Sequence, residues 1–450
     1  MDLTEILREP EGKTLEFKRD LSSPNPFLRS VSAFANTAGG TILIGVEDQT
    51  RQVRGVDEPL ALEERVTNLI SDAISPQLLP DIELLRYRNT HVLAVRVHPS
   101  PNRPHCLGSD PATGTYVRVG STNRNADSEL IAEMRRFANG ESFDERPMPC
   151  LDSEAIDFRA ASESFAEYRK LTQRDLDILG LRTTHQGRRV PTVGGVLLYG
   201  HNRLAHFPDA WIQAARFAGT DRARIVDRAE LKMMLADTIP AVVAFVERHM
   251  ASGIEIGPVR RQPRWTVPPV AVREALVNAV AHADYSQRGT PIRVAIFDDR
   301  LEVESPGLLP FGITLDDLPR GVSKLRNRVI GRVFHELRLI EQWGSGVQRM
   351  IAACRDSGLA EPVWEEIGNR LRVAIRTEPI GEVITYPADQ AILDALDSAD
   401  GRRTRELAET IGLSSRATRN RLARLVELGL VVEIGSGPTD PKRRYHKARR

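Results

Sequence analysis

Three polar residues recur at four-residue intervals within residues 269–285. On a helix, Glu274, Asn278 and His282 would therefore share one face. A carboxylate one turn from a carboxamide can orient a water molecule, while the carboxamide ligates a metal ion that bridges phosphates. The alternative interpretation is a helix face that is simply exposed to solvent. The apolar residues that would form the buried stripe are Val272, Ala275, Leu276 and Ala279.

Charged side chains also alternate with apolar ones near the N-terminus. In a predicted strand over residues 14–18, Glu16 and Lys18 lie on the same face because the side-chain period of a strand is two residues. A helix that ends at a pair of glycines follows, then a buried strand over residues 41–46. Asp48 comes directly after that strand. The alternative interpretation is a solvated strand face and an aspartate that begins a turn.

The C-terminal segment predicts three helices and a strand. The helices are expected over residues 390–396, 404–411 and 415–428, and an apolar run follows the third. This order is typical of a helix-turn-helix with a wing, in which the third helix offers its first two turns to the major groove.

The local charge of this segment supports a polyanionic partner. Between residues 401 and 450, thirteen Lys or Arg stand against five Asp or Glu, although the whole chain has a formal net charge of only +1. Such an asymmetry is the electrostatic footprint of nucleic-acid binding. We therefore expect duplex DNA as the partner, whereas the alternative is a helical unit that docks a protein. The expected contact residues on the third helix and on the wing are Arg416, Arg419, Asn420, Lys442, Arg443 and Arg444.

Composition indicates an ordinary multidomain protein. The chain has 450 residues, of which 41% are hydrophobic and 27% charged. Three scattered cysteines are too few for a disulfide framework or a zinc site, which fits a reducing compartment. The sequence shows no signal peptide and no apolar run long enough to span a bilayer, so we expect a cytoplasmic protein without membrane association.

Clusters of proline, glycine and charge mark the expected domain boundaries. Before about residue 376, short β-rich runs alternate with helical patterns, which predicts mixed α/β and α+β domains. The expected domains are an N-terminal one over 1–140, an α/β connector over 152–258, a third domain over 259–378 and the winged helix over 386–450.

Three segments of the first 140 residues resemble the Schlafen AlbA-type domain. They read LEFK at 15–18, SAFANTAGGTILIGVED at 32–48 and TYVRVGSTN at 115–123. The resemblance implies either a module that binds RNA or DNA, or a metal-dependent nuclease. In the nuclease pattern, Glu11, Glu16 and Asp48 would hold Mg²⁺ or Mn²⁺ with Lys18 beside them.

Residues 259–378 resemble the GHKL ATPases, in the divergent branch found after AlbA-type domains in bacterial transcriptional regulators. The matching runs are PVAVREALVNAVAHADY, SPGLLPFGIT and WGSGVQRMI. The resemblance implies a Bergerat-type α/β sandwich that binds ATP and Mg²⁺, with Glu274 as catalytic carboxylate and Asn278 as magnesium ligand.

The same resemblance assigns the remaining nucleotide contacts. Glu304 and Gly307 stand where the family has an adenine-reading aspartate and paired glycines. Gly344, Ser345 and Gly346 precede a helix, where a backbone without Cβ can approach phosphate and a helix N-terminus favours negative charge.

These observations predict an ATP-binding, DNA-binding transcriptional regulator with a nucleic-acid-binding N-terminal domain. Weak ATPase activity and nucleotide-dependent assembly into a homo-oligomer follow from the GHKL resemblance. The rival hypothesis is a Schlafen-like metal-dependent nuclease gated by nucleotide and acting in defence. A third is a scaffold that binds neither ATP nor metal.

Overall fold

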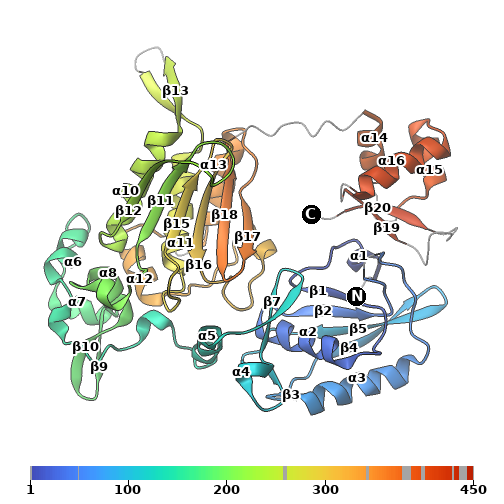
Figure 1. Cartoon of the computed structure of the whole chain (residues 1–450), viewed down its shortest axis with the longest axis horizontal. Helices are drawn as coiled ribbons and strands as arrows, with labels where there is room; N and C mark the ends of the chain where they lie inside the picture. The colour runs from blue at the N-terminus through green and yellow to red at the C-terminus, as the bar shows by residue number, and fades with distance from the viewer. Residues whose placement is uncertain are drawn as a thin grey trace. The chain divides into compact units, whose positions relative to one another are not determined.

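The structure is a computed structural model, and it divides into two compact units (Figure 1). The terminal unit comprises Met1–Ile131 with Glu382–Arg450, and the central unit comprises Ala132–Gly381. The residues described are 3–48, 50–256, 261–340, 344–377, 387–396, 401–427, 430–434 and 443–448. The expected contact residue Lys442 lies outside them, as does Trp343 of the WGSGVQRMI run.

A four-stranded sheet forms the core of the N-terminal part of the terminal unit. Its strands follow the order β1-β2-β5-β4, with β1 parallel to β2 and the other pairs antiparallel. The strands are β1 (Leu15–Lys18), β2 (Gly40–Ile44), β4 (Asp81–Tyr87) and β5 (Thr90–Val97).

Helix α2 (Pro24–Asn36) covers this sheet and confirms the helix expected between the first two strands. A proline in its first turn has the backbone angle that a helix requires. Phe27, Val31 and Phe34 are buried in one hydrophobic cluster with residues of β2 and β5. The helix is followed by Gly39 at φ 79°, a left-handed conformation that glycine adopts without strain.

The remaining elements of the N-terminal part are short, apart from two helices. Helix α5 begins in the terminal unit and continues into the central unit. The elements are α1 (Leu3–Ile6), α3 (Pro59–Ala73), β3 (Ile74–Ser75), β6 (Cys106–Leu107), α4 (Pro111–Gly114), β7 (Tyr116–Val119), β8 (Thr122–Asn125) and α5 (Ser128–Ala138).

The C-terminal part has the predicted helix-turn-helix and wing. Gly412 at φ 70° ends the second helix, and the hydroxyl of Ser414 accepts the backbone N–H of Ala417 at 3.3 Å. The elements are α14 (Pro387–Ala395), α15 (Thr404–Ile411), α16 (Ser415–Glu427), β19 (Val431–Ile434) and β20 (Arg444–Lys447).

A six-stranded mixed sheet organises the central unit. Its strands follow the order β12-β11-β15-β16-β18-β17, and only β11 and β15 are parallel neighbours. The strands are β11 (Ile212–Phe217), β12 (Ile225–Leu231), β15 (Ile292–Ile296), β16 (Arg300–Pro306), β17 (Val363–Ile367) and β18 (Arg370–Arg376). The expected connector, residues 152–258, therefore supplies two strands to the same sheet as residues 259–378.

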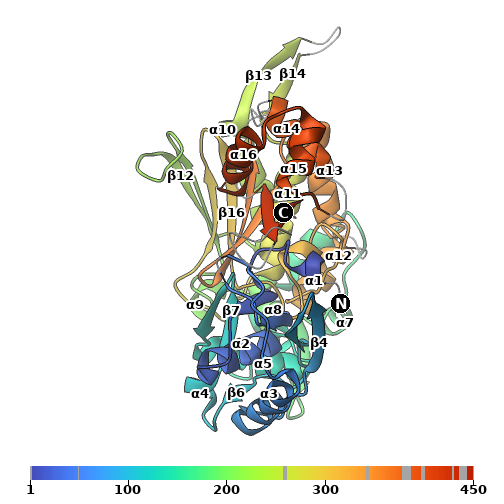
Figure 2. The ribbon, with the colours of Figure 1, turned by 90° about the vertical axis from the view of Figure 1, so that its right-hand side faces the viewer.

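Helices pack on one face of this sheet and make a two-layer α/β sandwich. Figure 2 shows α11 and α13 on the same side of β16. Leu197, Ile239, Leu276 and Ile330 belong to one continuous core. The helices are α10 (Leu235–Met250), α11 (Pro269–His282), α12 (Arg328–Glu336) and α13 (Gly346–Asp356).

Shorter elements complete the central unit. They are η1 (Phe143–Glu145), η2 (Ser153–Ala155), α6 (Phe158–Phe165), α7 (Gln173–Ile178), β9 (Arg182–His185), β10 (Arg188–Pro191), α8 (Val193–Tyr199), α9 (Arg203–His206), β13 (Ala251–Ile256), β14 (Arg261–Trp265) and η3 (Leu315–Asp317). No helix within the described residues has the length and hydrophobicity that a bilayer crossing requires.

The polar run over residues 140–153 is an anchored segment, although its composition is typical of a linker. Asp144 is completely buried, and its carboxylate accepts the backbone N–H groups of Arg328, Val329 and Ile330 at 3.0, 2.7 and 2.9 Å. These are N–H groups of the first turn of α12, which have no partner within the helix. Burial raises the pKa of Asp144, and these hydrogen bonds oppose the shift.

We expect Asp144→Ala to lower the free energy of unfolding of the central unit by about 1–3 kcal/mol, because three N–H groups lose a buried acceptor. Chemical denaturation followed by circular dichroism measures the effect. Glu141→Ala, which removes an exposed carboxylate three residues earlier, is the matched control. Equal stability of the two variants would contradict the assigned role.

Candidate functional site

The central unit contains a cavity of about 440 Å³ at the junction of α11, β16 and α13. Apolar side chains from the sheet and the loop after β16 form much of its wall, which suits a flat ring system. Polar groups converge from several elements. The polar residues that line it include Glu274, Asn278, His282, Ser305, Lys324 and Arg349.

Glu274 lies under the N-terminus of α13. Its side chain is buried, and its Oε1 accepts a hydrogen bond from Nη2 of Arg349 at 2.9 Å. A Cβ atom on Gly346 would lie 2.5 Å from Glu274 Oε2 and 3.8 Å from Asn278 Nδ2. The two helices can approach this closely only because residue 346 is glycine. The structure thus brings the carboxylate and the carboxamide of α11 together with Gly346, which lies 72 and 68 residues later in the chain, respectively.

The glycine segment borders the cavity. Gly344 has φ 64°, a conformation that glycine tolerates best, and both Gly344 and Gly346 line the cavity. Ser345 precedes the helix, and its hydroxyl accepts a hydrogen bond from Nη1 of Arg349 at 3.0 Å. The first turn of α13 therefore presents its N-terminal partial positive charge at the cavity.

Two polar side chains of α11 have unused hydrogen-bonding capacity at the cavity. The half-buried carboxamide of Asn278 makes no hydrogen bond within the described residues, and the buried Nδ1 of His282 has no partner there either. Burial lowers the pKa of His282 to about 4, so its ring is neutral at physiological pH. An amide oxygen and a neutral imidazole are both able to bind a ligand or a metal-bound water.

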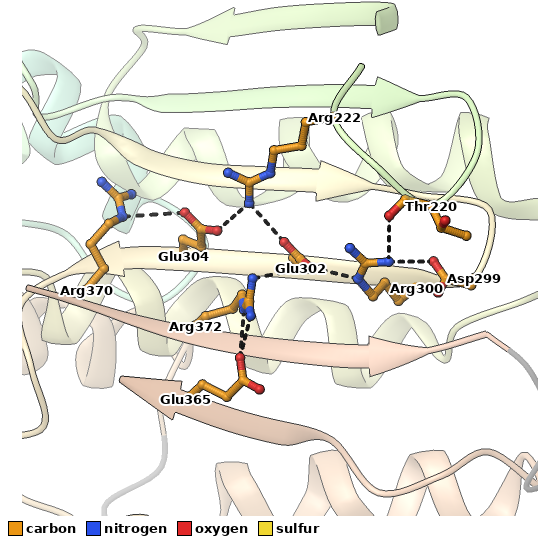
Figure 3. Close-up of polar contacts among 9 residues, drawn as sticks. All are labelled: Thr220, Arg222, Asp299, Arg300, Glu302, Glu304, Glu365, Arg370 and Arg372. Atoms are coloured by element: carbon orange, nitrogen blue, oxygen red, sulfur yellow. Dashed lines mark hydrogen bonds and ion pairs between the residues drawn. The ribbon is translucent and has the colours of Figure 1, made fainter. Parts of the chain in front are cut away.

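Glu304 does not contribute to this cavity, so the expected adenine-reading role of its side chain is wrong. The two-residue period of β16 directs Val303 and Ser305 to the cavity and Glu302 and Glu304 to the opposite face of the sheet. There Glu304 is buried in ion pairs with Arg222 and Arg370 (Figure 3). Ser305 is the polar side chain of β16 that faces the cavity.

A charged network covers the opposite face of the sheet and accounts for the burial of both glutamates. Arg222 bridges Glu302 and Glu304, with a distance of 2.9 Å to Glu302 Oε2. Arg300 Nε donates to Glu302 Oε1 at 2.7 Å and Nη1 donates to the carbonyl oxygen of Thr220 at 3.1 Å. Figure 3 shows this network spanning neighbouring strands. Its carboxylates are neutralised by arginines and are structural.

Gly307 lines the cavity. The guanidinium group of Arg326 lies so close to it that a side chain at position 307 would clash. Gly307 has φ 100°, and a Cβ atom at this position would lie 2.0 Å from Nη1 of Arg326. Arg326 donates from Nη1 to the carbonyl oxygen of His282 at 2.9 Å and from Nη2 to that of Leu308 at 2.6 Å. The sequence predicts no role for Arg326 or Arg349, because no spacing rule links these two residues to α11.

The N-terminal carboxylates come close together but do not form a set of free metal ligands. Glu11 and Asp48 share a hydrogen bond, and Glu11 Oε1 accepts the backbone N–H of Phe17 at 2.5 Å. Glu16 is buried, with Oε1 paired to Lys18 and Oε2 paired to Nη1 of Arg118 at 2.7 Å. Within the described ranges, no group of three or more His, Cys, Asp or Glu side chains is arranged to hold a metal ion. This arrangement does not fit the ligand set that the nuclease hypothesis requires.

The arginines of α16, the third helix of the winged helix, fall into two groups by their contacts. Arg416, Arg419 and Asn420 are exposed on α16. Arg421 instead pairs with the buried carboxylate of Asp389, from Nη1 to Oδ1 at 2.8 Å, and Arg424 lies 3.8 Å from the same carboxylate. The exposed residues are the three that the sequence predicted as contacts with DNA.

The wing arginines are engaged within the winged helix. Arg443 pairs with Glu433 at 2.6 Å, and Arg444 Nη1 donates to the carbonyl oxygen of Gly401 at 2.8 Å. Their expected phosphate contacts would therefore have to compete with these interactions. This favours α16 over the wing as the main site of contact with DNA.

Three family models match the chain in the predicted order. The Schlafen AlbA_2 family matches residues 11–127, the family described as "Putative ATP-dependent DNA helicase recG C-terminal" matches residues 289–375, and a winged helix-turn-helix DNA-binding family matches residues 387–432. In class, this is a DNA-binding protein of the AlbA/Schlafen type with an ATPase-like domain. Its three segments are a Schlafen AlbA-type segment, an ATPase-like segment and a winged helix. Helix α11 precedes the matched ATPase-like residues.

Two solved structures are similar to the chain. The DIP2311 protein from Corynebacterium diphtheriae is 22% identical, with 92% of this chain and 87% of that chain covered and a TM-score of 0.44. The N-terminal domain of a RecG-related protein from Nitrosomonas europaea is 19% identical, with 28% of this chain and 94% of that chain covered and a TM-score of 0.22. The assignment of the three segments rests on the family matches.

We expect the stability of the terminal unit to depend on Glu11 between about pH 4.5 and 7. Burial, together with the nearby Asp48, raises the pKa of Glu11 from 4.5 to about 7, so the folded state favours the protonated form. The stabilising contribution is therefore fully present below pH 4.5 and is lost as the pH rises through about 7. Glu11→Gln, which imitates the protonated acid, should unfold at a higher temperature than the wild type at pH 8 but not at pH 4. Exposed Glu9→Gln is the control, and an identical difference at both pH values would contradict the assignment.

We expect alanine substitutions in the two groups of arginines on α16 to have different effects, one on DNA binding and the other on stability. Replacing Arg416 and Arg419 by alanine should weaken duplex DNA binding by roughly tenfold or more per residue and leave thermal unfolding unchanged. Arg421→Ala should lower the free energy of unfolding by about 1–3 kcal/mol, because the buried carboxylate of Asp389 loses its main partner. Fluorescence anisotropy with a mixed-sequence duplex at two salt concentrations measures binding. Full affinity of the Arg416 and Arg419 double variant would exclude this face of α16.

Proposed function

We propose that this protein is an ATP-binding transcriptional regulator of the cytoplasm, which binds duplex DNA through its winged helix and a nucleotide in its central cavity. The observation that carries the nucleotide proposal is the meeting of Glu274, Asn278 and the N-terminus of α13 at one cavity. A helix N-terminus next to glycines suits phosphate, and the apolar wall suits a base.

Magnesium fits the donor set of the proposed nucleotide site. The carboxamide of Asn278 has no hydrogen-bond partner within the described residues, and its oxygen is a ligand type that Mg²⁺ accepts beside phosphate oxygens and water. The bound ion would neutralise phosphate charge. Lys324 and Arg349 line the same cavity and add positive charge for the phosphates.

The surroundings of Glu274 favour nucleotide sensing over rapid hydrolysis. Its Oε1 is held by Arg349 at 2.9 Å and lies 3.4 Å from Nη1 of Arg273. A carboxylate oxygen that is held by guanidinium groups is not free to orient an attacking water molecule. ATP would then act mainly by occupying the cavity, and turnover would require Arg349 to move.

We expect Asn278→Ala to abolish magnesium-dependent ATP binding in isothermal titration calorimetry, because the variant lacks the proposed metal ligand. Glu274→Gln preserves the shape of the side chain and should retain binding within about a few fold while losing any residual hydrolysis. Asn202→Ala, at an exposed asparagine outside the cavity lining, is the control. Wild-type protein that binds no ATP at millimolar concentration with Mg²⁺ would refute the nucleotide proposal.

A further inference from the structure

Helix α5 contacts the loop after β16 through an ion pair in the central unit. The carboxylate of Glu133 is 14% exposed, and its Oε1 lies 3.0 Å from Nε of Arg326. The same guanidinium hydrogen-bonds the carbonyl oxygens of His282 and Leu308. One arginine therefore joins α5, the C-terminal end of α11 and the loop that borders the 440 Å³ cavity. Burial raises the pKa of Glu133, and the charge of Arg326 opposes that shift.

An aromatic contact joins α5 to the same loop one helical turn further on. The rings of Phe137 and Phe311 pack edge to face with centroids 5.5 Å apart. The ammonium group of Lys324 lies 3.7 Å from the centroid of Phe137, within the range of a cation–π interaction. Lys324 also lines the cavity that holds the proposed nucleotide site.

The loop after β16, residues 307–327, lies between the 440 Å³ cavity and α5. A second cavity of about 230 Å³ separates part of the loop from α5 and the residues after it. Pro310, Lys324, Leu325 and Arg328 line both cavities. A ligand in the 440 Å³ cavity that orders these residues must also change their packing in the 230 Å³ cavity, because the same side chains line both.

The far end of the loop is held by the residues that follow α5. Asp144 accepts three backbone N–H groups at the start of α12, where the loop ends. Segment 133–145 therefore contacts the loop at Phe311, near its start, and at Arg326 and the first turn of α12, at its end. Helix α5 is continuous from Ser128, directly after the residues matched by the Schlafen AlbA_2 family.

We propose that α5 transmits nucleotide occupancy of the central cavity to the Schlafen AlbA-type segment, with Glu133 and Arg326 as its positioning residues. The inference rests on the proposed nucleotide function. Nucleotide bound against the loop orders Lys324, which lines the cavity, and through the loop backbone orders the nearby Arg326. The ion pair and ring contacts then stiffen the second half of α5. By linkage, a ligand that orders α5 from the other side strengthens nucleotide binding by the same factor.

Hydrogen–deuterium exchange of the full chain with and without ATP and Mg²⁺ tests this inference, in parallel with calorimetry on the same samples. In the wild type, we expect ATP to slow exchange of the amides of residues 132–138 by about fivefold or more. Glu133→Gln should still bind ATP, with an affinity within about tenfold of the wild type, but exchange in α5 should no longer respond. Glu129→Gln makes the same chemical change at an exposed position of the same helix and should behave as the wild type.

The outcomes separate this inference from the proposed function. Wild-type protein that binds ATP without a change in α5 exchange overturns the inference alone, as does a Glu133→Gln variant that responds like the wild type. Absence of ATP binding overturns both. If Glu133→Gln does not fold, Phe137→Leu removes the ring contacts while keeping an apolar side chain, and the same loss of response is expected. A merely structural role of either residue would alter stability without removing the response to ATP.

Discussion

The arrangement of the central unit depends on how the C-terminal carbonyl groups of α11 are satisfied. The last carbonyl groups of any helix lack partners within it, and here they lie in the core. Asn327 is completely buried and donates from Nδ2 to the carbonyl oxygens of Ala281 and Ala283 at 3.0 and 2.7 Å. Arg326 supplies the partner for His282 between them. These bonds fix the end of α11 against the loop before α12, and so fix where the polar face of α11 meets the cavity.

The sequence was informative where a regular period decides the geometry. The 3.6-residue repeat placed Glu274 and Asn278 on one face of a helix, and the structure has that helix over Pro269–His282. The same reasoning anticipated α2 and the exposed residues of α16. Glu304 was assigned by resemblance instead, and the two-residue period of its own strand already pointed to the opposite face, because the neighbouring Val303 is apolar.

The contacts that the sequence does not predict join residues that are far apart in the chain. Glu16 and Arg118 are 102 residues apart, and no local pattern shows that their side chains are buried against each other. Residues 140–153 are mostly polar and contain two prolines and a glycine, so their composition indicates a linker. Yet Asp144 caps a helix 184 residues later in the chain. In both cases a buried carboxylate is stabilised by groups far away in the sequence, and tertiary structure alone brings those groups near.

Arg349 of α13 connects the proposed phosphate-binding segment to the carboxylate proposed for hydrolysis. Arg349 pairs with Glu274 through Nη2 and with Ser345 through Nη1, so it connects the carboxylate of α11 to the glycine segment at the start of its own helix. A phosphate at this helix N-terminus would compete with the carboxylate for the same guanidinium, since both are anions that arginine binds in a bidentate manner. Release of Glu274 would then follow from nucleotide binding instead of preceding it. In the structure Arg349 holds the carboxylate in an ion pair, and under the proposed function any hydrolysis would begin only after the phosphates have drawn Arg349 away.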